Sequence, residues 1–458
     1  MLSSGEAAAR LARTYAKVTW RIMPLIIISY LVSYIDRVNV SFAKLQMSAD
    51  IQLSDAAYGF GAGIFFIGYF LFEVPSNLLL HRIGARFWIS RIMVTWGLIS
   101  AAMAFTAPLG RLFGVSSETS FYTLRFLLGA AEAGFFPGII LYLTYWYPAH
   151  RQSRILALLL VAQPVAFILG APLSGAIMQA FAESALMHGW QWMYLIEGAP
   201  AIVLGVVFLS TMSNGIDDAP WLDAGEKADL KAHLGRENHV RHDLSLRSLF
   251  AHPMQWTFTA IYLLIVIGVY GVNFWLPTII RTSGVSSVLT VGLVTAIPYA
   301  FGAVIMIVAT RHAERTNEKR WHATVAAVLG GVGLVLSAFY ADSTVLTVAF
   351  ITVAIAGSMT AMALFWSFPG SMLTGVAAAA GIAAVNSIGN LGGFLGPFLL
   401  GWLSEGLGGQ RAGLILLGGA MMAGGLIMGA TCRDLGVRRG APSVPEGRPA
   451  ASLSAESL

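Results

Sequence analysis

The chain has 458 residues, of which 57% are hydrophobic and only 11% are charged. A soluble globular domain carries about 25% charged residues, so this chain has too little charge to cover a water-exposed surface. The composition predicts a multi-pass membrane protein, in which the formal net charge of +5 reflects basic cytoplasmic loops rather than nucleic-acid binding.

Sequence motifs for catalysis and cofactor binding are missing. The single cysteine, Cys432, excludes a disulfide framework within one chain and any metal site built from several cysteines. The sequence also has no P-loop, no GxGxxG after a strand, no HExxH and no GxSxG. We therefore expect no enzymatic activity, no bound metal, no organic cofactor and no nucleic-acid partner.

Twelve segments are long and apolar enough to cross a membrane, which takes about 20 residues. In chain order they cover residues 22–43, 57–80, 88–107, 121–146, 154–180, 190–211, 255–279, 286–309, 322–340, 345–369, 375–403 and 412–431. This pattern predicts an all-α membrane protein with twelve transmembrane helices.

The only long polar segment, 212–254, divides the spans into six plus six. It predicts a central loop between two six-helix bundles, preceded by an N-terminal tail and followed by a C-terminal tail. Of the 28 Lys and Arg residues, 22 lie in the tails, the central loop and the other connections on the same side of the membrane. The positive-inside rule places these segments in the cytoplasm. The predicted divisions, in order, are 1–21, 22–211, 212–254, 255–431 and 432–458.

The two halves also resemble each other. The basic turn "NLLLHRIGAR" (77–86) follows the second span, and "TRHAERTNEKR" (310–320) follows the eighth. The motif "GAPLSG" (170–175) in the fifth span is similar to "GPFLLG" (396–401) in the eleventh. Parallel repeats of this kind favour two bundles that rock about a site between them.

Several longer motifs identify a family resemblance. They are "YIDRVNVSFA" (34–43), "GIFFIGYFLFEVPSNLLLHRIGAR" (63–86), "LRFLLGAAEAGFFPGIILYLTYWYP" (124–148), "HGWQWMYLIEGAPA" (188–201) and "AVNSIGNLGGFLGP" (384–397). Together they resemble the Major Facilitator Superfamily and, within it, the bacterial branch of the anion:cation symporter family that imports carboxylates. The resemblance covers nearly the whole chain. It implies two six-helix bundles in the bacterial inner membrane and proton-coupled transport.

Charged residues away from the ends of the predicted spans all lie in the N-terminal half. An ionisable side chain at the bilayer centre costs about 2.5–3.5 kcal/mol on insertion scales, so each needs a partner or a water-filled cavity. These residues are Asp36, Arg37, Glu73, Arg125, Glu132 and Glu197. We expect ion chemistry in the N-terminal half and an uncharged lining in the C-terminal half.

Depth and helix geometry predict how these charges are arranged. Asp36 and Arg125 lie at similar depth, so we expect them to pair. Adjacent helical residues project about 100° apart, so Arg37 would face the central cavity and bind a carboxylate with its guanidinium. Glu132, removed from water, would carry the coupling proton, and the resemblance implies the same roles. A fixed Asp36–Arg125 pair that only holds two spans together is the alternative. Glu73 and Glu197 are expected to be structural.

Six uncharged residues complete the predicted substrate site. A hydroxyl, an amide or an indole at mid-span depth can contact a substrate, although each can also serve helix packing. The candidates are Tyr34, Tyr69, Gln163, Trp366, Asn386 and Asn390. The resemblance implies substrate contact for Tyr34, Gln163, Trp366 and Asn386.

The two basic turns are predicted cytoplasmic gates, as the resemblance implies. The residues concerned are Arg82, Gly84 and Arg86 in the first turn and Glu314 and Arg315 in the second. The first turn departs from the family pattern at Asn77 and His81, which puts details of a latch in doubt but not the fold.

These features together predict a monomeric secondary transporter that imports a small organic carboxylate with protons by alternating access. Its partners would be the organic anion, the proton and the lipid bilayer. Sodium coupling, exchange of organic anions and a non-transporting membrane sensor are the alternatives. A hydroxylated dicarboxylate would favour amide and hydroxyl contacts, whereas an aromatic acid would favour Trp366, and the sequence does not choose between them.

Overall fold

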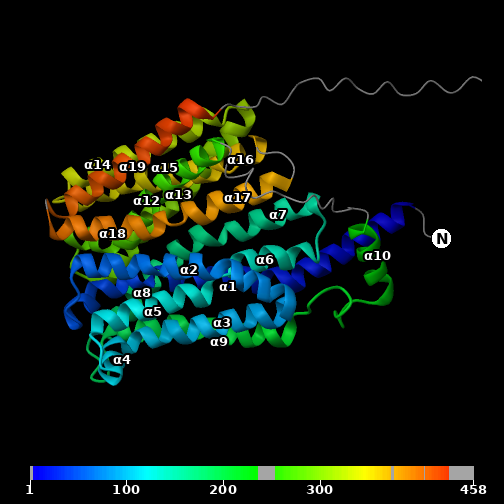
Figure 1. The fold of residues 1–458 in the computed structure, drawn as a ribbon, viewed down its shortest axis with the longest axis horizontal. Coiled ribbons are helices and arrows are strands. Elements are labelled where there is room, and N and C mark those ends of the chain that lie inside the picture. The colour runs from blue at the N-terminus through cyan, green and yellow to red at the C-terminus, as the bar shows by residue number, and fades with distance from the viewer. Residues whose placement is uncertain (1–3, 236–252, 373–375, 407, 433–458) are drawn as a thin grey trace, which may run out of the picture.

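The computed structural model describes residues 4–235, 253–372, 376–406 and 408–432. These residues are almost entirely helical and contain no strand, which confirms the expected all-α fold. The predicted tail over 433–458 and most of the central loop, 236–252, lie outside the described residues. Figure 1 shows the helices of the N-terminal half below and those of the C-terminal half above, with their axes running in roughly the same direction.

The N-terminal half begins with one long helix, α1, which continues through the predicted tail into the first span. Its helices are α1 (Ser4–Asp50), α2 (Asp55–Ile83), α3 (Ala85–Ala102), η1 (Met103–Phe105), α4 (Thr106–Phe113), α5 (Ser117–Glu132), α6 (Phe135–Thr144), α7 (Ala149–Leu160), α8 (Ala162–Ala180), α9 (Gly189–Thr211) and α10 (Ala224–Leu234).

The C-terminal half repeats this arrangement with long helices followed by interrupted ones. Its helices are α12 (Pro253–Thr282), α13 (Val288–Thr316), α14 (Arg320–Phe339), α15 (Thr344–Phe365), α16 (Ser367–Met372), α17 (Val376–Gly389), α18 (Gly392–Glu405) and α19 (Gly409–Thr431).

By length and composition, eleven helical stretches of the described chain can cross a membrane. The fifth predicted span, 154–180, is not among them, and the chain there forms α7 and α8 with a break at Val161. The eleventh span also breaks, between α17 and α18 at Asn390 and Leu391. Spans five and eleven occupy corresponding places in the two halves, so the interruptions follow the repeat.

Serine caps begin four of the long helices at the end of the molecule away from the N-terminus. Ser54, Ser116, Ser287 and Ser343 each accept a hydrogen bond from the backbone three residues later. Such a cap satisfies one of the free N–H groups at a helix start. The four capped helices are α2, α5, α13 and α15, which are the second and fourth spans of each half. The two halves therefore use the same capping residue at corresponding helix starts.

Corresponding glycines bring the two halves together. A Cβ atom on Gly175 in α8 would lie 2.8 Å from the carbonyl oxygen of Val288 in α13. A Cβ atom on Gly401 in α18 would lie 2.3 Å from the carbonyl oxygen of Asp55 in α2. Small residues allow such close backbone approach between membrane helices. These glycines end the two similar motifs at 170–175 and 396–401, so the repeat builds both cross-bundle contacts.

The end of the molecule away from the N-terminus is closed by polar contacts as well. Lys44 forms an ion pair with Asp55 at 2.6 Å and lies 4.3 Å from the ring centroid of Trp275 in the other bundle. The Tyr58 hydroxyl donates to the carbonyl oxygen of Phe274 at 2.7 Å. The bundles therefore meet at the end that the positive-inside rule assigns to the outside.

The N-terminal part of α1 packs against the start of the central loop. Lys17 and Arg10 form ion pairs with Glu226 at 2.7 Å and Asp229 at 2.6 Å. Both acids lie on α10, which begins with a capping box between Asp223 and Glu226. The predicted tail over 1–21 is thus largely helical, because α1 begins at Ser4 and extends through it.

Candidate functional site

Asp36 and Arg37 contact different helices, as their separation on the helix predicts, but Asp36 does not contact the expected one. It accepts hydrogen bonds from the indole N–H of Trp96 at 2.8 Å and the hydroxyl of Ser100 at 3.0 Å, both on α3. The predicted Asp36–Arg125 pair is therefore wrong in this structure. The physical reason is that the Asp36 side chain reaches Trp96 and Ser100 on α3 rather than Arg125 on α5.

Arg125 is fully buried and bonds to the backbone of α2 instead of to a carboxylate. Its guanidinium donates to the carbonyl oxygens of Gly61 at 3.3 Å and Ala62 at 3.0 Å. It also lies 5.0 Å from the centroid of the Phe65 ring, a distance at which a cation is attracted to an aromatic face. Arg125 thus holds α5 against α2, while its Nη1 atom has no hydrogen-bond partner among the described residues.

Arg37 forms an ion pair with Glu132, the residue predicted to carry the proton. The Glu132 side chain is 2% exposed and that of Arg37 is 12% exposed. The guanidinium also lies 5.0 Å from the ring centroid of Tyr34 and 5.6 Å from that of Tyr69. Two predicted substrate ligands, Tyr34 and Tyr69, therefore lie beside Arg37. The ion-pair partner of Arg37 is Glu132, the predicted proton carrier.

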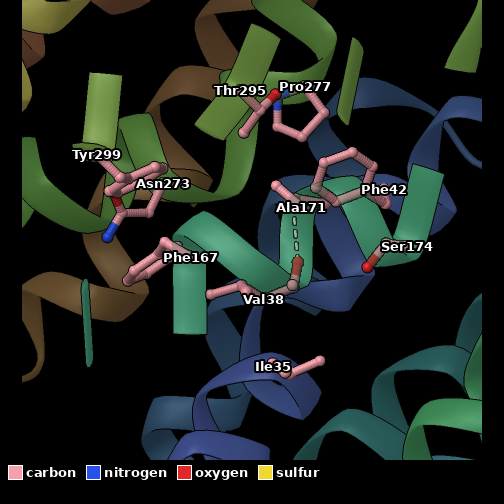
Figure 2. A pocket seen from close by; sticks show the side chains of 12 residues that line it. Ile35, Val38, Phe42, Phe167, Ala171, Ser174, Asn273, Pro277, Thr295 and Tyr299 are labelled. Carbon is pink, nitrogen blue, oxygen red and sulfur yellow. Dashed lines mark hydrogen bonds between the residues drawn. The ribbon is translucent and has the colours of Figure 1, made fainter. Parts of the chain in front are cut away.

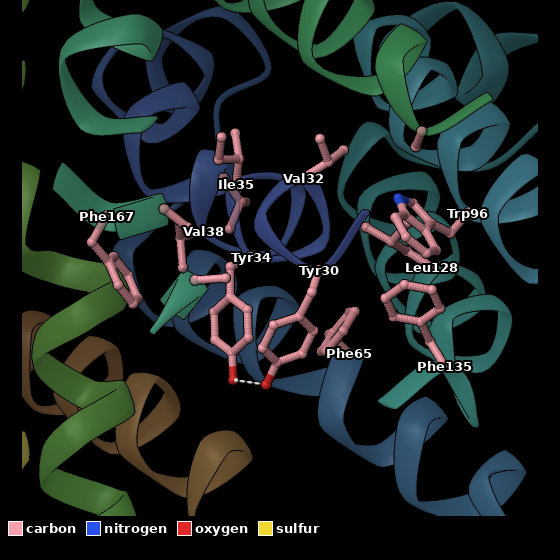
Figure 3. Close-up of a cluster of buried hydrophobic side chains, with 14 of the residues drawn as sticks. Tyr30, Val32, Tyr34, Ile35, Val38, Phe65, Trp96, Leu128, Phe135 and Phe167 are labelled. Atoms are coloured by element: carbon pink, nitrogen blue, oxygen red, sulfur yellow. Dashed lines mark hydrogen bonds between the residues drawn. The ribbon is translucent and has the colours of Figure 1, made fainter. Parts of the chain in front are cut away.

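Aromatic packing fixes the position of α1 around this pair. Figure 3 shows Tyr30 and Tyr34 projecting from α1 on the side where Phe65 lies, with Trp96 and Phe135 packed edge to face farther along the same cluster. The Tyr30 hydroxyl donates to that of Tyr34 at 3.4 Å. The tyrosines thus present hydroxyl groups beside Arg37 while their rings fill the apolar core.

Glu132 is the last residue of α5, because the chain turns sharply after it. Gly134 has φ +87°, in the left-handed region, and α6 begins at Phe135. A Cβ atom on Gly134 would lie 2.3 Å from the Ser76 hydroxyl oxygen. The glycine in "AEAGFF" thus interrupts the fourth span at the point where a carboxylate must meet Arg37.

We expect Gly134→Ala to destabilise the protein more than Gly114→Ala does. Both glycines have positive φ, at +87° and +68°, and this strain alone costs an alanine about 1–2 kcal/mol. Gly114 has open space around its Cβ position, whereas Gly134 faces Ser76. Thermal unfolding of the purified variants measures the difference. Equal unfolding midpoints for the two variants would show that Ser76 can move away from the new methyl group at no cost in stability.

The C-terminal half contributes a second group of predicted ligands. The Tyr262 hydroxyl on α12 donates to the amide oxygen of Asn386 on α17 at 3.5 Å. The Tyr262 ring lies 4.9 Å from the Trp366 ring, centroid to centroid. Tyr262 thus links two predicted ligands, Trp366 and Asn386, which lie on different helices.

Sequence reasoning missed Tyr262 and Tyr270, which connect this group to the Arg37 pair. Tyr270 interacts electrostatically with Arg37 and Tyr34, and Tyr262 with Tyr270 and Tyr34. The two tyrosines lie eight residues apart on α12, so they occupy nearly the same face. The sequence pattern that could have indicated them is two tyrosines on one face of the otherwise apolar seventh span.

Glu73 lies at the same interface between the halves, although we expected it to be only structural. The Ser387 hydroxyl on α17 donates to its carboxylate at 3.3 Å. Glu73 also interacts electrostatically with Tyr69 and Tyr262. It therefore extends the row of polar groups from α2 to α17.

Gln163 and Asn390 lie beside the breaks in spans five and eleven. Gln163 is the second residue of α8, directly after the break at Val161, and its side chain is half-buried. Asn390 lies in the break before α18, where its backbone N–H donates to the Asn386 carbonyl at 2.9 Å. Their predicted correspondence in depth agrees with the repeat, and their contact with substrate stays a prediction.

A small cavity lies between the halves, beyond Tyr34 toward the closed end. Its volume is about 10 Å³, and Figure 2 shows Ile35 and Val38 facing Phe167, Asn273 and Tyr299 across it. The Tyr299 hydroxyl donates to Asn273 at 2.8 Å, and the Tyr299 ring stacks on Phe167 at 4.2 Å. Phe167 and Tyr299 come from different bundles, so this contact seals the interface on that side of Arg37.

The family model of the Major Facilitator Superfamily matches residues 26–397. The chain belongs to this superfamily. The fold agrees: a solved D-xylose-proton symporter superposes with a TM-score of 0.71 at 15% identity, covering 89% of this chain and 97% of that one. The protein is therefore a transporter of the superfamily and not an enzyme, and its fold is the expected one of two helical bundles.

Three curated relatives are similar over most of the transporter. A putative metabolite transport protein, NicT, from Pseudomonas putida is 42% identical and covers 89% of this chain and 92% of its own. A putative tartrate transporter from Agrobacterium vitis is 43% identical, covering 91% and 90%. A quinolone resistance transporter from Acinetobacter baumannii is 42% identical, covering 89% and 92%.

The predicted gate residues of this superfamily member lie at the turns after α2 and α13. Gly84, with φ +99°, joins α2 to α3. The Arg86 side chain donates to the Leu209 carbonyl at 2.6 Å, which ties the turn to the end of α9, and Arg82 is exposed. Glu314 and Arg315 are exposed at the end of α13. Their gating roles stay predictions.

Proposed function

We propose that this transporter imports a small organic carboxylate by proton symport across the bacterial cytoplasmic membrane, with both termini in the cytoplasm. The observation that carries the proposal is the ion pair between Arg37 and Glu132, which lies beside tyrosines from both halves. An intramembrane ionisable pair of this kind typically marks a proton or substrate pathway.

The pair supplies a direct coupling between proton and anion. While Glu132 is ionised, it neutralises Arg37 and competes with any incoming carboxylate. A proton on Glu132 removes this competitor, and the guanidinium can then bind the substrate carboxylate bidentately. Binding of the anion and binding of the proton therefore favour each other, as a symporter requires.

The C-terminal half is proposed to hold the rest of the substrate. Trp366 offers a stacking face, and Asn386 offers amide hydrogen bonds. Tyr262 positions both residues, so one cluster can accept a flat ring or a hydroxylated chain. The relatives named as putative tartrate transporters support a carboxylate as the class of substrate.

Alternating access is supported by where the halves meet. They contact each other closely at the end away from the N-terminus, through Gly401 against α2 and Gly175 against α13. Among the described residues no ion pair joins the two halves, so these contacts can separate without breaking one. Rocking of the bundles about Arg37 would then expose the pair to the other side.

Uptake into proteoliposomes under an imposed pH gradient tests the proposal. The panel comprises tartrate, nicotinate, phthalate and a fluoroquinolone, with uncharged xylose as the control solute. We expect accumulation of at least one organic acid above its equilibrium level, abolished by a protonophore and unaffected by replacing sodium with potassium. Accumulation driven only by sodium, or no driven accumulation of any acid, would contradict proton–carboxylate symport.

A further inference from the structure

A second group of buried polar side chains lies where α1 packs against α3, α8 and α9, away from the Arg37–Glu132 pair. Asp36 and Asn39 project from α1, Ser174 from α8, and Tyr194 and Glu197 from α9. Their exposed fractions are 1%, 1%, 2%, 0% and 3%, respectively. Glu197, which we expected to be structural, thus shares a buried site with Asp36.

The group contains several polar atoms that have no hydrogen-bond partner among the described residues. They are Glu197 Oε2, Asn39 Oδ1 and the Tyr194 hydroxyl, and Arg125 on α5, which interacts with Tyr194, adds a fourth, Nη1. Buried polar atoms without a partner are rare in folded proteins and often signal a functional site. Four in one group therefore need a reason beyond helix packing.

Electrostatic contacts show that these atoms belong to one site. Glu197 interacts with Asp36 and Asn39, and its Oε1 atom accepts a hydrogen bond from Ser174 at 2.7 Å. Tyr194 interacts with Arg125, Glu197 and Asp36. The Tyr194 hydroxyl is thus close to both carboxyl groups and to Arg125.

Neither carboxyl group of this site has an ion-pair partner in the part of the chain that the structure describes. Each unpaired buried charge costs several kcal/mol, so two ionised carboxylates cannot both persist here at low cost. Asp36 already accepts hydrogen bonds from Trp96 and Ser100 on α3. Glu197 accepts a hydrogen bond from Ser174 and interacts with Asn39, and its Oε2 atom, which has no hydrogen-bond partner among the described residues, can hold a proton.

We propose that Glu197 is a second proton-binding residue of the transport cycle, separate from Glu132. The inference rests on the proposed proton symport. The proton is held on Oε2 of Glu197 and leaves to water. The carboxylate that remains accepts a hydrogen bond from the Tyr194 hydroxyl, which lies close to Glu197. This hydroxyl has no hydrogen-bond partner among the described residues, so the site contains a donor for the ionised state.

Infrared difference spectra between acid and alkaline buffers test whether Glu197 titrates. The full chain is reconstituted in phosphatidylethanolamine–phosphatidylglycerol vesicles, and no substrate is needed. Wild type should show carboxylic-acid bands that disappear at alkaline pH, and E197Q should lack one of them. D36N and E132Q assign the others, and E118Q, at an exposed position, leaves the buried bands unchanged. Identical spectra for wild type and E197Q, or a Glu197 band that never titrates, would overturn the proposal.

Transport separates this proposal from the proposed function. If wild type is proton-driven, E197Q should lose at least half of the gradient-driven accumulation while E197D, which keeps a carboxyl group, retains most of it. An E197Q variant with wild-type accumulation and pH profile would overturn the role of Glu197 and leave proton symport standing. A wild type without driven uptake would overturn symport, while the infrared bands would still report Glu197. Thermal unfolding confirms that each variant is folded, and E197A, which also lacks a carboxyl group, replaces E197Q in both assays if E197Q is not.

Discussion

Replacing Arg37 with lysine should weaken the apparent affinity for the transported acid about ten- to hundredfold. A hydrogen bond to a charged group contributes about 1.5–3 kcal/mol, and each 1.4 kcal/mol corresponds to about tenfold in affinity. Lysine keeps the positive charge but loses the planar pair of donors that matches a carboxylate. Concentration-dependent uptake at a fixed pH gradient measures the loss.

A matched substitution shows whether the effect belongs to the site. Arg281 lies at the exposed end of α12 and donates only to the Ser286 carbonyl at 3.2 Å, so Arg281→Lys should leave the affinity unchanged. Removing both members of the ion pair, in R37Q/E132Q, should recover stability relative to R37Q, because a lone buried carboxylate no longer remains. It should not recover transport. An unchanged affinity in R37K would remove Arg37 from the substrate site.

Glu132→Gln should abolish accumulation driven by a pH gradient while substrate exchange at equal pH continues. Glutamine cannot bind and release a proton, but its carbonyl oxygen still accepts a hydrogen bond from Arg37. Without the Glu132 carboxylate, nothing competes with the substrate for the Arg37 guanidinium. The substrate then binds without a proton, so the pH gradient no longer drives its accumulation. Parallel assays of driven uptake and counterflow separate the two activities.

The control for this variant is Glu118→Gln. Glu118 is exposed at the start of α5, where it accepts a hydrogen bond from the Tyr122 hydroxyl at 2.6 Å. It belongs to the same helix as Glu132 but lies at its other end. Driven uptake by E118Q should match wild type. Full retention of driven uptake by E132Q would assign the coupling proton to another residue.

The sequence predicted well how deep each residue lies in the membrane and how the two halves correspond. It predicted less well which face of a helix contacts which neighbour. The apolar segments predicted the helices, and the two glycine motifs marked the closest contacts between the halves. The break in the fifth span was missed, because the apolar run through Val161 continues without a glycine or proline at that residue. Local hydrophobicity therefore predicts where a helix crosses but not whether it is continuous.

The arrangement of charges shows the same limit. Depth placed Asp36 level with Arg125, and the angle between adjacent residues correctly separated Asp36 from Arg37. Neither argument says which neighbouring helix covers which face of α1, so Asp36 was paired with α5 although it contacts α3. Tyr262 and Glu197 were undervalued for a related reason, since their importance depends on neighbours from other helices.

The most direct measurement follows proton movement caused by the substrate alone. Proteoliposomes with equal pH on both sides and a trapped pH-sensitive dye receive an inward gradient of the acid that the uptake panel identifies. Proton symport predicts acidification of the interior in wild type and none in E132Q. Uptake of the acid without a change in internal pH, or with alkalinisation, would contradict coupling of the two through the Arg37–Glu132 pair.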